Sequence, residues 1–156
     1  MKRKIIIAVS WILVLLCMTV IFMLSSQDAE SSAKLSGDVM GPVGKIITFL
    51  FGEAGHNIFR KFAHFFEYAG LSFLMYNAFY QSKKEKRSSP ILPYIMSVLY
   101  AVTDEIHQYF VPGRACMLFD IGVDALGALL GIAVFFVFVR TFIAIKERHG
   151  RKMLHF

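Results

Sequence analysis

Ionisable side chains recur at helical spacing within apolar stretches of this sequence. Arg60, His64 and Glu67 follow one another four and three residues apart, so they share one face of a helix. A histidine and a carboxylate one turn apart can act as general base and general acid, or can ligate a divalent metal ion. The sequence has no HExxH motif and no nucleophile with an evident base. The spacing therefore predicts a polar site but does not specify its chemistry.

A second group of polar residues surrounds position 105. Asp104, His107 and Gln108 share one helical face, whereas Glu105 points about 100° away from it. This second stretch therefore offers polar side chains in two directions.

A third group begins with two carboxylates four residues apart, Asp120 and Asp124. Gly127 and Gly131 continue the same stripe, and small residues four apart allow two helices to approach closely. We expect this stripe to face another helix.

Four apolar stretches must position these groups. Hydrophobic residues make up 56% of the 156 residues, more than is typical of soluble domains. The expected membrane spans are residues 5–24, 59–80, 91–110 and 118–145. The sequence thus predicts an all-α membrane protein, a single domain over residues 1–156 with four transmembrane helices. Residues 42–51 are too few to span, and we expect a short interfacial or re-entrant helix there.

The distribution of basic residues predicts the orientation. With both termini in the cytoplasm, 12 of the 17 Lys and Arg residues lie on the inner side and 5 on the outer side. The positive-inside rule therefore favours an N-in and C-in topology. Because the basic residues lie at the ends of apolar runs, they indicate membrane anchoring and no nucleic-acid partner.

Depth in the membrane brings the three groups together. At a rise of about 1.5 Å per residue, Glu67, Asp104 and Asp124 all fall in the outer half of their helices. A charged side chain facing lipid costs several kcal/mol, so these faces should turn inward and meet.

The cluster could be a polar core or a functional site. A polar core would only hold the helices together, with Arg60 or Arg114 paired to Asp120 or Glu67. Ionisable residues inside a membrane usually serve function, and their number here favours a functional site.

The motifs resemble the VanZ-like family, named for a protein associated with teicoplanin resistance. The resemblance rests on RKFAHFFEY at residues 60–68, DEIHQYFVPGR at residues 104–114, Asp120 followed by Gly127 and Gly131, and SSQ at residues 25–27. Asp124 departs from the pattern, because many relatives carry Asn there. The predicted ligand-binding residues are Arg60, Lys61, His64, Glu67, Tyr68, Asp104, Glu105, His107, Gln108, Arg114, Asp120 and Asp124.

The resemblance implies a protein of the bacterial plasma membrane that acts in glycopeptide resistance or envelope homeostasis. One hypothesis is a module that binds or transports an amphipathic or lipid-linked ligand at the outer leaflet, such as a lipid-linked cell-wall precursor or a lipoglycopeptide. Its cationic groups would pair with phosphate or carboxylate. The alternative is an intramembrane enzyme acting on a lipid headgroup, with or without a divalent metal as cofactor. Its candidate catalytic residues are His64, Glu67, Asp104, Glu105, His107 and Asp120.

Overall fold

The structure is a computed structural model that describes residues 1–28, 34, 41, 53–83, 89–114 and 117–153. The short helix expected at residues 42–51 lies outside the described residues. Within the described part of the chain, every regular element is a helix. They are α1 (Lys2–Ser25), α3 (Glu53–Ser82), α4 (Ile91–Tyr109) and α5 (Leu118–Met153). The all-α fold class and the four long helices predicted from the sequence are confirmed.

Local sequence explains where the helices begin and end. α4 starts at Ile91, directly after Pro90, and Pro93 falls in its first turn, where a missing N–H breaks no helical hydrogen bond. α3 begins at Glu53, six residues before the start expected at position 59. The first turns of α3 are helical but polar. The expected span was placed by hydropathy, so it left these turns out.

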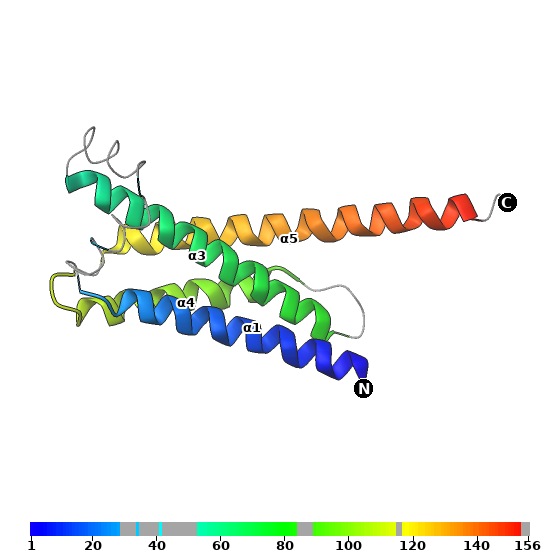
Figure 1. Cartoon of the computed structure of the whole chain (residues 1–156), viewed down its shortest axis with the longest axis horizontal. Helices are drawn as coiled ribbons and strands as arrows, with labels where there is room; N and C mark the ends of the chain where they lie inside the picture. The colour runs from blue at the N-terminus through cyan, green and yellow to red at the C-terminus, as the bar shows by residue number, and fades with distance from the viewer. Residues whose placement is uncertain (29–33, 35–40, 42–52, 84–88, 115–116, 154–156) are drawn as a thin grey trace.

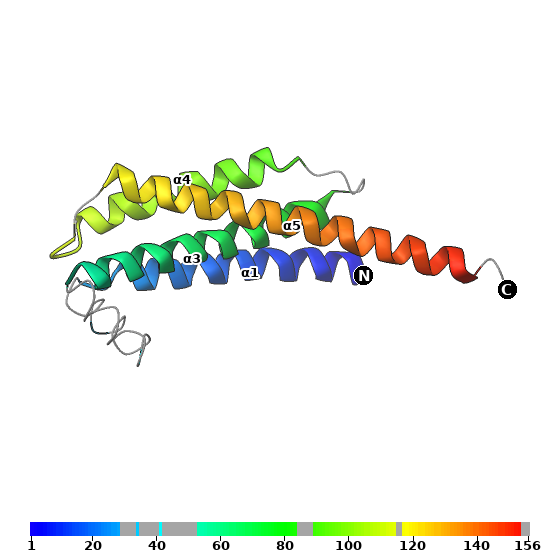
Figure 2. The same ribbon diagram turned by 90° about the horizontal axis from the view of Figure 1, so that it is seen from above.

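Consecutive helices run in opposite directions along the long axis of the molecule (Figures 1 and 2). α3 lies centrally and packs most extensively on α5, then on α1 and α4. The C-terminal part of α5 projects beyond the other helices in both views. As a result, the end of α1, the start of α3, the end of α4 and the start of α5 meet at one end of the bundle.

The close packing of α3 on α5 depends on two glycines. Gly127 faces the backbone of Phe65, and Gly131 faces the backbone of Ala69 and the hydroxyl of Ser72. A Cβ atom at either glycine would overlap these atoms. The Ser72 hydroxyl also donates a hydrogen bond of 2.7 Å to the carbonyl of Ala128 on α5. The prediction that this stripe faces another helix is confirmed.

Polarity is arranged with apolar side chains outside and many polar ones inside. Leu15, Phe66, Leu99 and Phe138 are exposed, while Asp104, Glu105, Gln108 and Asp124, among other polar residues, are buried. Water-soluble proteins almost never bury Asp and Glu fully unless these residues are paired. The arrangement suits a lipid surrounding, in which ionisable groups face the interior of the helix bundle.

Two helical segments of the described chain are long and apolar enough to cross a membrane, Lys2–Ser25 and Leu118–Lys146. They correspond to the first and fourth spans expected from the sequence. α3 and α4 contain most of the buried or half-buried ionisable residues, and this lowers their hydropathy.

Candidate functional site

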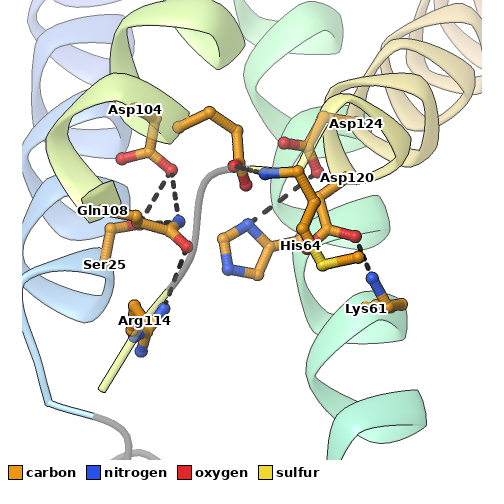
Figure 3. Close-up of polar contacts among 10 residues, drawn as sticks. Ser25, Lys61, His64, Asp104, Gln108, Arg114, Asp120 and Asp124 are labelled. Carbon is orange, nitrogen blue, oxygen red and sulfur yellow. Dashed lines mark hydrogen bonds and ion pairs between the residues drawn. The ribbon is translucent and has the colours of Figure 1, made fainter. Parts of the chain in front are cut away.

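The polar residues gather at the end of the bundle where all four helices meet, as Figure 3 shows. Two groups are visible there. One consists of Ser25, Asp104, Gln108 and Arg114, and the other of Lys61, His64, Asp120 and Asp124.

The first group is a chain of hydrogen bonds centred on Asp104. Ser25, the last residue of α1, donates to Asp104 Oδ2 at 2.8 Å. Gln108, one turn further along α4, donates to the same oxygen at 3.1 Å. The carbonyl oxygen of Gln108 then accepts a hydrogen bond from Arg114 Nη1 at 3.2 Å. The chain therefore connects a buried carboxylate to a cation at the end of the bundle.

Arg114 is positioned by a tight turn after α4. Its backbone N–H donates to the carbonyl of Val111 at 3.1 Å, and Gly113 has a φ of 75°. Pro at the second position and Gly with positive φ at the third are typical of a type II turn. Burial, and then the charge of nearby Arg60, lower the pKa of the Arg114 guanidinium. Its Nε is buried and has no hydrogen-bond partner among the described residues.

The second group connects α3 with α5. Lys61 forms an ion pair with Asp120 and also lies over the ring of Phe119, with Nζ 4.9 Å from its centroid. One turn deeper, His64 Nδ1 lies 3.8 Å from Asp124 Oδ1. This distance is too long for a hydrogen bond.

Glu105 joins α4 to the start of α5. It is buried, and its Oε2 accepts a hydrogen bond of 3.0 Å from the backbone N–H of Met117. Glu105 faces a different neighbour from Asp104, whose partner Ser25 belongs to α1. The helical spacing had predicted only that the two side chains point about 100° apart.

A small cavity of about 10 Å³ lies between these groups. This is close to the space that one water molecule requires. The residues lining it are Arg60, Lys61, His64, Glu105, Gln108, Asp120, Val123 and Asp124. Seven of these eight residues were predicted from the sequence to bind a ligand, and the structure brings them around one space.

Several buried polar atoms at this end of the bundle have no hydrogen-bond partner among the described residues. They are Glu67 Oε2, Tyr68 OH, Asp104 Oδ1, Arg114 Nε and both carboxylate oxygens of Asp124. Buried polar groups normally form hydrogen bonds, so each of these unpaired atoms needs an explanation such as a bound water, ion or ligand. Their number here indicates that the site has unused capacity for hydrogen bonding.

Five predicted residues do not line the cavity. His107 turns toward α1, where its Nε2 lies 3.0 Å from the hydroxyl of Ser26 and its ring stacks on Phe22. Glu67 and Tyr68 are separate from the cavity lining, although each has one of these unpaired buried oxygens. Asp104 and Arg114 reach the cavity only through Gln108.

The pairing of charges differs from the polar core considered for the sequence. The sequence suggested ion pairs of Arg60 or Arg114 with Asp120 or Glu67. In the structure Lys61 pairs with Asp120. Arg60 and Arg114 take part in neither ion pair found among the described residues. The reason is that Lys61, one residue after Arg60, projects toward α5 from the face of α3 that packs on it.

Sequence reasoning missed two kinds of contributor. Ser25 and Ser26 are part of the site through Asp104 and His107, and the only signal was the SSQ motif at the end of an apolar run. The backbone N–H of Met117 has no signal in a sequence. For metal binding, the described residues contain no group of three or more His, Cys, Asp or Glu side chains arranged to hold an ion.

Comparison with known families gives a match over most of the chain. The family model described as VanZ/LLP1 matches residues 10–139. This range includes the SSQ motif, both longer motifs, and Gly127 and Gly131 of α5. No curated protein and no solved structure matches the chain in these comparisons. The two long apolar helices and the family match together indicate a membrane protein, and the chain belongs to the VanZ/LLP1 family.

Proposed function

We propose that this protein binds the anionic headgroup of an amphipathic or lipid-linked molecule at the outer leaflet of a bacterial plasma membrane. In this proposal all four helices cross the membrane, with both termini inside. The polar end of the bundle then lies at the outer surface. Family membership suggests a protein of the teicoplanin-resistance type, so the ligand would be a lipid-linked cell-wall precursor or a lipoglycopeptide.

The antiparallel arrangement supports four spans. α3 and α4 lie alongside the two most apolar helices and run the length of the bundle (Figures 1 and 2). Their outward residues are apolar, including Phe62 and Phe66 on α3 and Ile95 and Leu99 on α4. Helices whose charged residues point inward and whose apolar residues point outward can lie in lipid at low cost.

The observation that carries the proposal is Arg114. Its guanidinium is half-buried at the end of the bundle, with Nη1 bonded to Gln108 and Nε without a partner among the residues that the structure describes. Arg60 lies close enough for its charge to affect Arg114, and it also lines the cavity. Arg binds phosphate and carboxylate through parallel N–H donors, and an unused donor beside a second cation fits such a group.

A binding measurement tests the proposal directly. We expect the purified protein in detergent to bind a polyprenyl phosphate and to lose most of that affinity on Arg114→Gln. Arg140→Gln is the matched control, because Arg140 lies far along α5 over the ring of Phe136 and should be dispensable. Equal affinity of both variants and the wild type would exclude Arg114 as the anion-binding residue.

A cellular measurement tests the biological role. We expect expression of the protein in a susceptible bacterium to raise the inhibitory concentration of teicoplanin, and Arg114→Gln to cancel the increase at equal protein level. An unchanged inhibitory concentration with wild-type protein would contradict the resistance role but not headgroup binding, which the purified protein tests.

A further inference from the structure

The charges around the cavity do not balance. Arg60 and Lys61 face three carboxylates, those of Glu105, Asp120 and Asp124. Lys61 is paired with Asp120, and the imidazole of His64 is charged only when it is protonated. Arg60 is therefore the one other cation in the lining that the structure describes that is always charged, and it must compensate two carboxylates. Buried charges without compensation are costly, and proteins generally pair them, neutralise them or bind an ion beside them.

Asp124 is the least satisfied of the three. Its side chain is 1% exposed, and neither carboxylate oxygen accepts a hydrogen bond from the described residues. By contrast, Glu105 accepts the N–H of Met117. Asp124 lines the cavity, and the nearest basic atom paired with it, His64 Nδ1, is 3.8 Å away. Figure 3 shows the two side chains facing each other across this gap.

The carboxylate of Asp124 would be satisfied by a group that donates hydrogen bonds and also has a positive charge. A primary ammonium group supplies both, with three N–H donors and no acceptor. Its nitrogen is similar in size to a water oxygen, so it suits a cavity of about 10 Å³. A trimethylammonium group is several times larger and has no N–H donor.

We propose that the ligand is zwitterionic, with a primary ammonium group that enters the cavity against Asp124 and an anionic group that binds Arg114 and Arg60. This inference rests on the proposed function, which assigns the anionic group, and adds the second half of the headgroup. The chemical class is an amino-alkyl phosphate or an amino acid-bearing amphiphile. The binding site then has the Asp124 carboxylate and the Arg60 side chain at the cavity, and the Arg114 guanidinium bonded to Gln108, which also lines it.

The test compares headgroups on the purified full-length protein. The probes are short-chain phosphatidylethanolamine, its N-acetyl derivative and phosphatidylglycerol, titrated in detergent with choline chloride as the salt. All three have the same phosphate, but only the first also has an ammonium group. We expect phosphatidylethanolamine to bind on the order of 10-fold more tightly, the range for adding a hydrogen bond between charged groups.

Two substitutions assign the effect to one residue. Asp124→Asn keeps the side-chain shape, and we expect it to remove the preference for the amine while leaving the affinity for phosphatidylglycerol unchanged. Asp28→Asn makes the same chemical change at an exposed carboxylate that does not line the cavity. We expect it to retain the preference, because it leaves the charges around the cavity unchanged. If Asp124→Asn fails to fold, the headgroup series on the wild-type protein still decides the question.

The remaining outcomes separate the two proposals. Equal affinity for all three probes would overturn the zwitterionic ligand while the binding of anionic headgroups stands. Absence of binding to any polyprenyl or glycerol phosphate would overturn both. A preference that is present in choline and weakens when sodium or potassium replaces it would support an ammonium site that these ions compete for. A preference that Asp124→Asn leaves unchanged would overturn the ammonium proposal.

Discussion

Ser25 at the end of α1 donates a hydrogen bond of 2.8 Å to the buried carboxylate of Asp104 on α4. The two residues are 79 positions apart in the sequence, and both are almost completely buried. This contact ties the first helix, which has no charged residue inside the bundle, to the polar end of the molecule. It also fixes Asp104 so that its second donor, Gln108, can present its carbonyl oxygen to Arg114.

The first prediction concerns this contact. Ser25→Ala removes one of the two donors to Asp104 Oδ2, and a hydrogen bond to a charged group contributes about 1.5–3 kcal/mol. We expect a lower thermal midpoint in detergent and weaker ligand binding through Arg114. Thr19→Ala on the same helix is the control, because the Thr19 hydroxyl is exposed and donates to the carbonyl of Leu15 within the same helix. An equal loss of stability in both variants would argue against a special role for Ser25.

The second prediction concerns the contact between α3 and α5. Gly127→Ala places a methyl group into the backbone of Phe65, so the two helices must move apart. Overpacking of this kind costs about 1–3 kcal/mol, and we expect a matching fall in the free energy of unfolding. Gly122→Ala on the same helix has open space around its Cβ and should be neutral or stabilising, because Ala favours helix. A neutral Gly127→Ala would show that the helices are less closely packed.

The third prediction measures the ion pair between Lys61 and Asp120. Both side chains are partly exposed, at 28% and 16%, so solvent screens the attraction. A double-mutant cycle with Lys61→Met and Asp120→Asn should give a coupling of about 0.5–1 kcal/mol that decreases as salt is added. A coupling near zero, with a large coupling between Arg60 and Asp120 instead, would favour the pairing that the sequence suggested.

The fourth prediction tests the orientation in the membrane. Cys116 lies outside the described residues but follows Arg114 closely in the sequence. In a Cys17→Ser background we expect a membrane-impermeant thiol reagent to label Cys116 in intact cells. A cysteine placed at exposed Ser89, in a Cys17→Ser and Cys116→Ser background, should react only after permeabilisation. The reverse pattern would exclude the N-in and C-in topology.

Much of the site could be predicted because helical periodicity is a local property. The four-residue spacing of Asp120, Asp124 and the following glycines determines that they share a face. The same periodicity separates Glu105 from Asp104, and the structure indeed directs them to different partners, Met117 and Ser25. These relationships need only the geometry of a single helix.

The sequence by itself determined the class of protein, the four helices and the polar faces that meet at one end of them. The tertiary structure alone decided which side chains pair, because pairing depends on how far each helix is shifted and rotated against its neighbours. Lys61 rather than Arg60 pairs with Asp120, and His107 contacts Ser26 outside the cavity. Asp124 is buried and accepts no hydrogen bond from the described residues. The close approach that the α5 glycines permit sets the spacing of α3 and α5, and with it the size of the cavity between them.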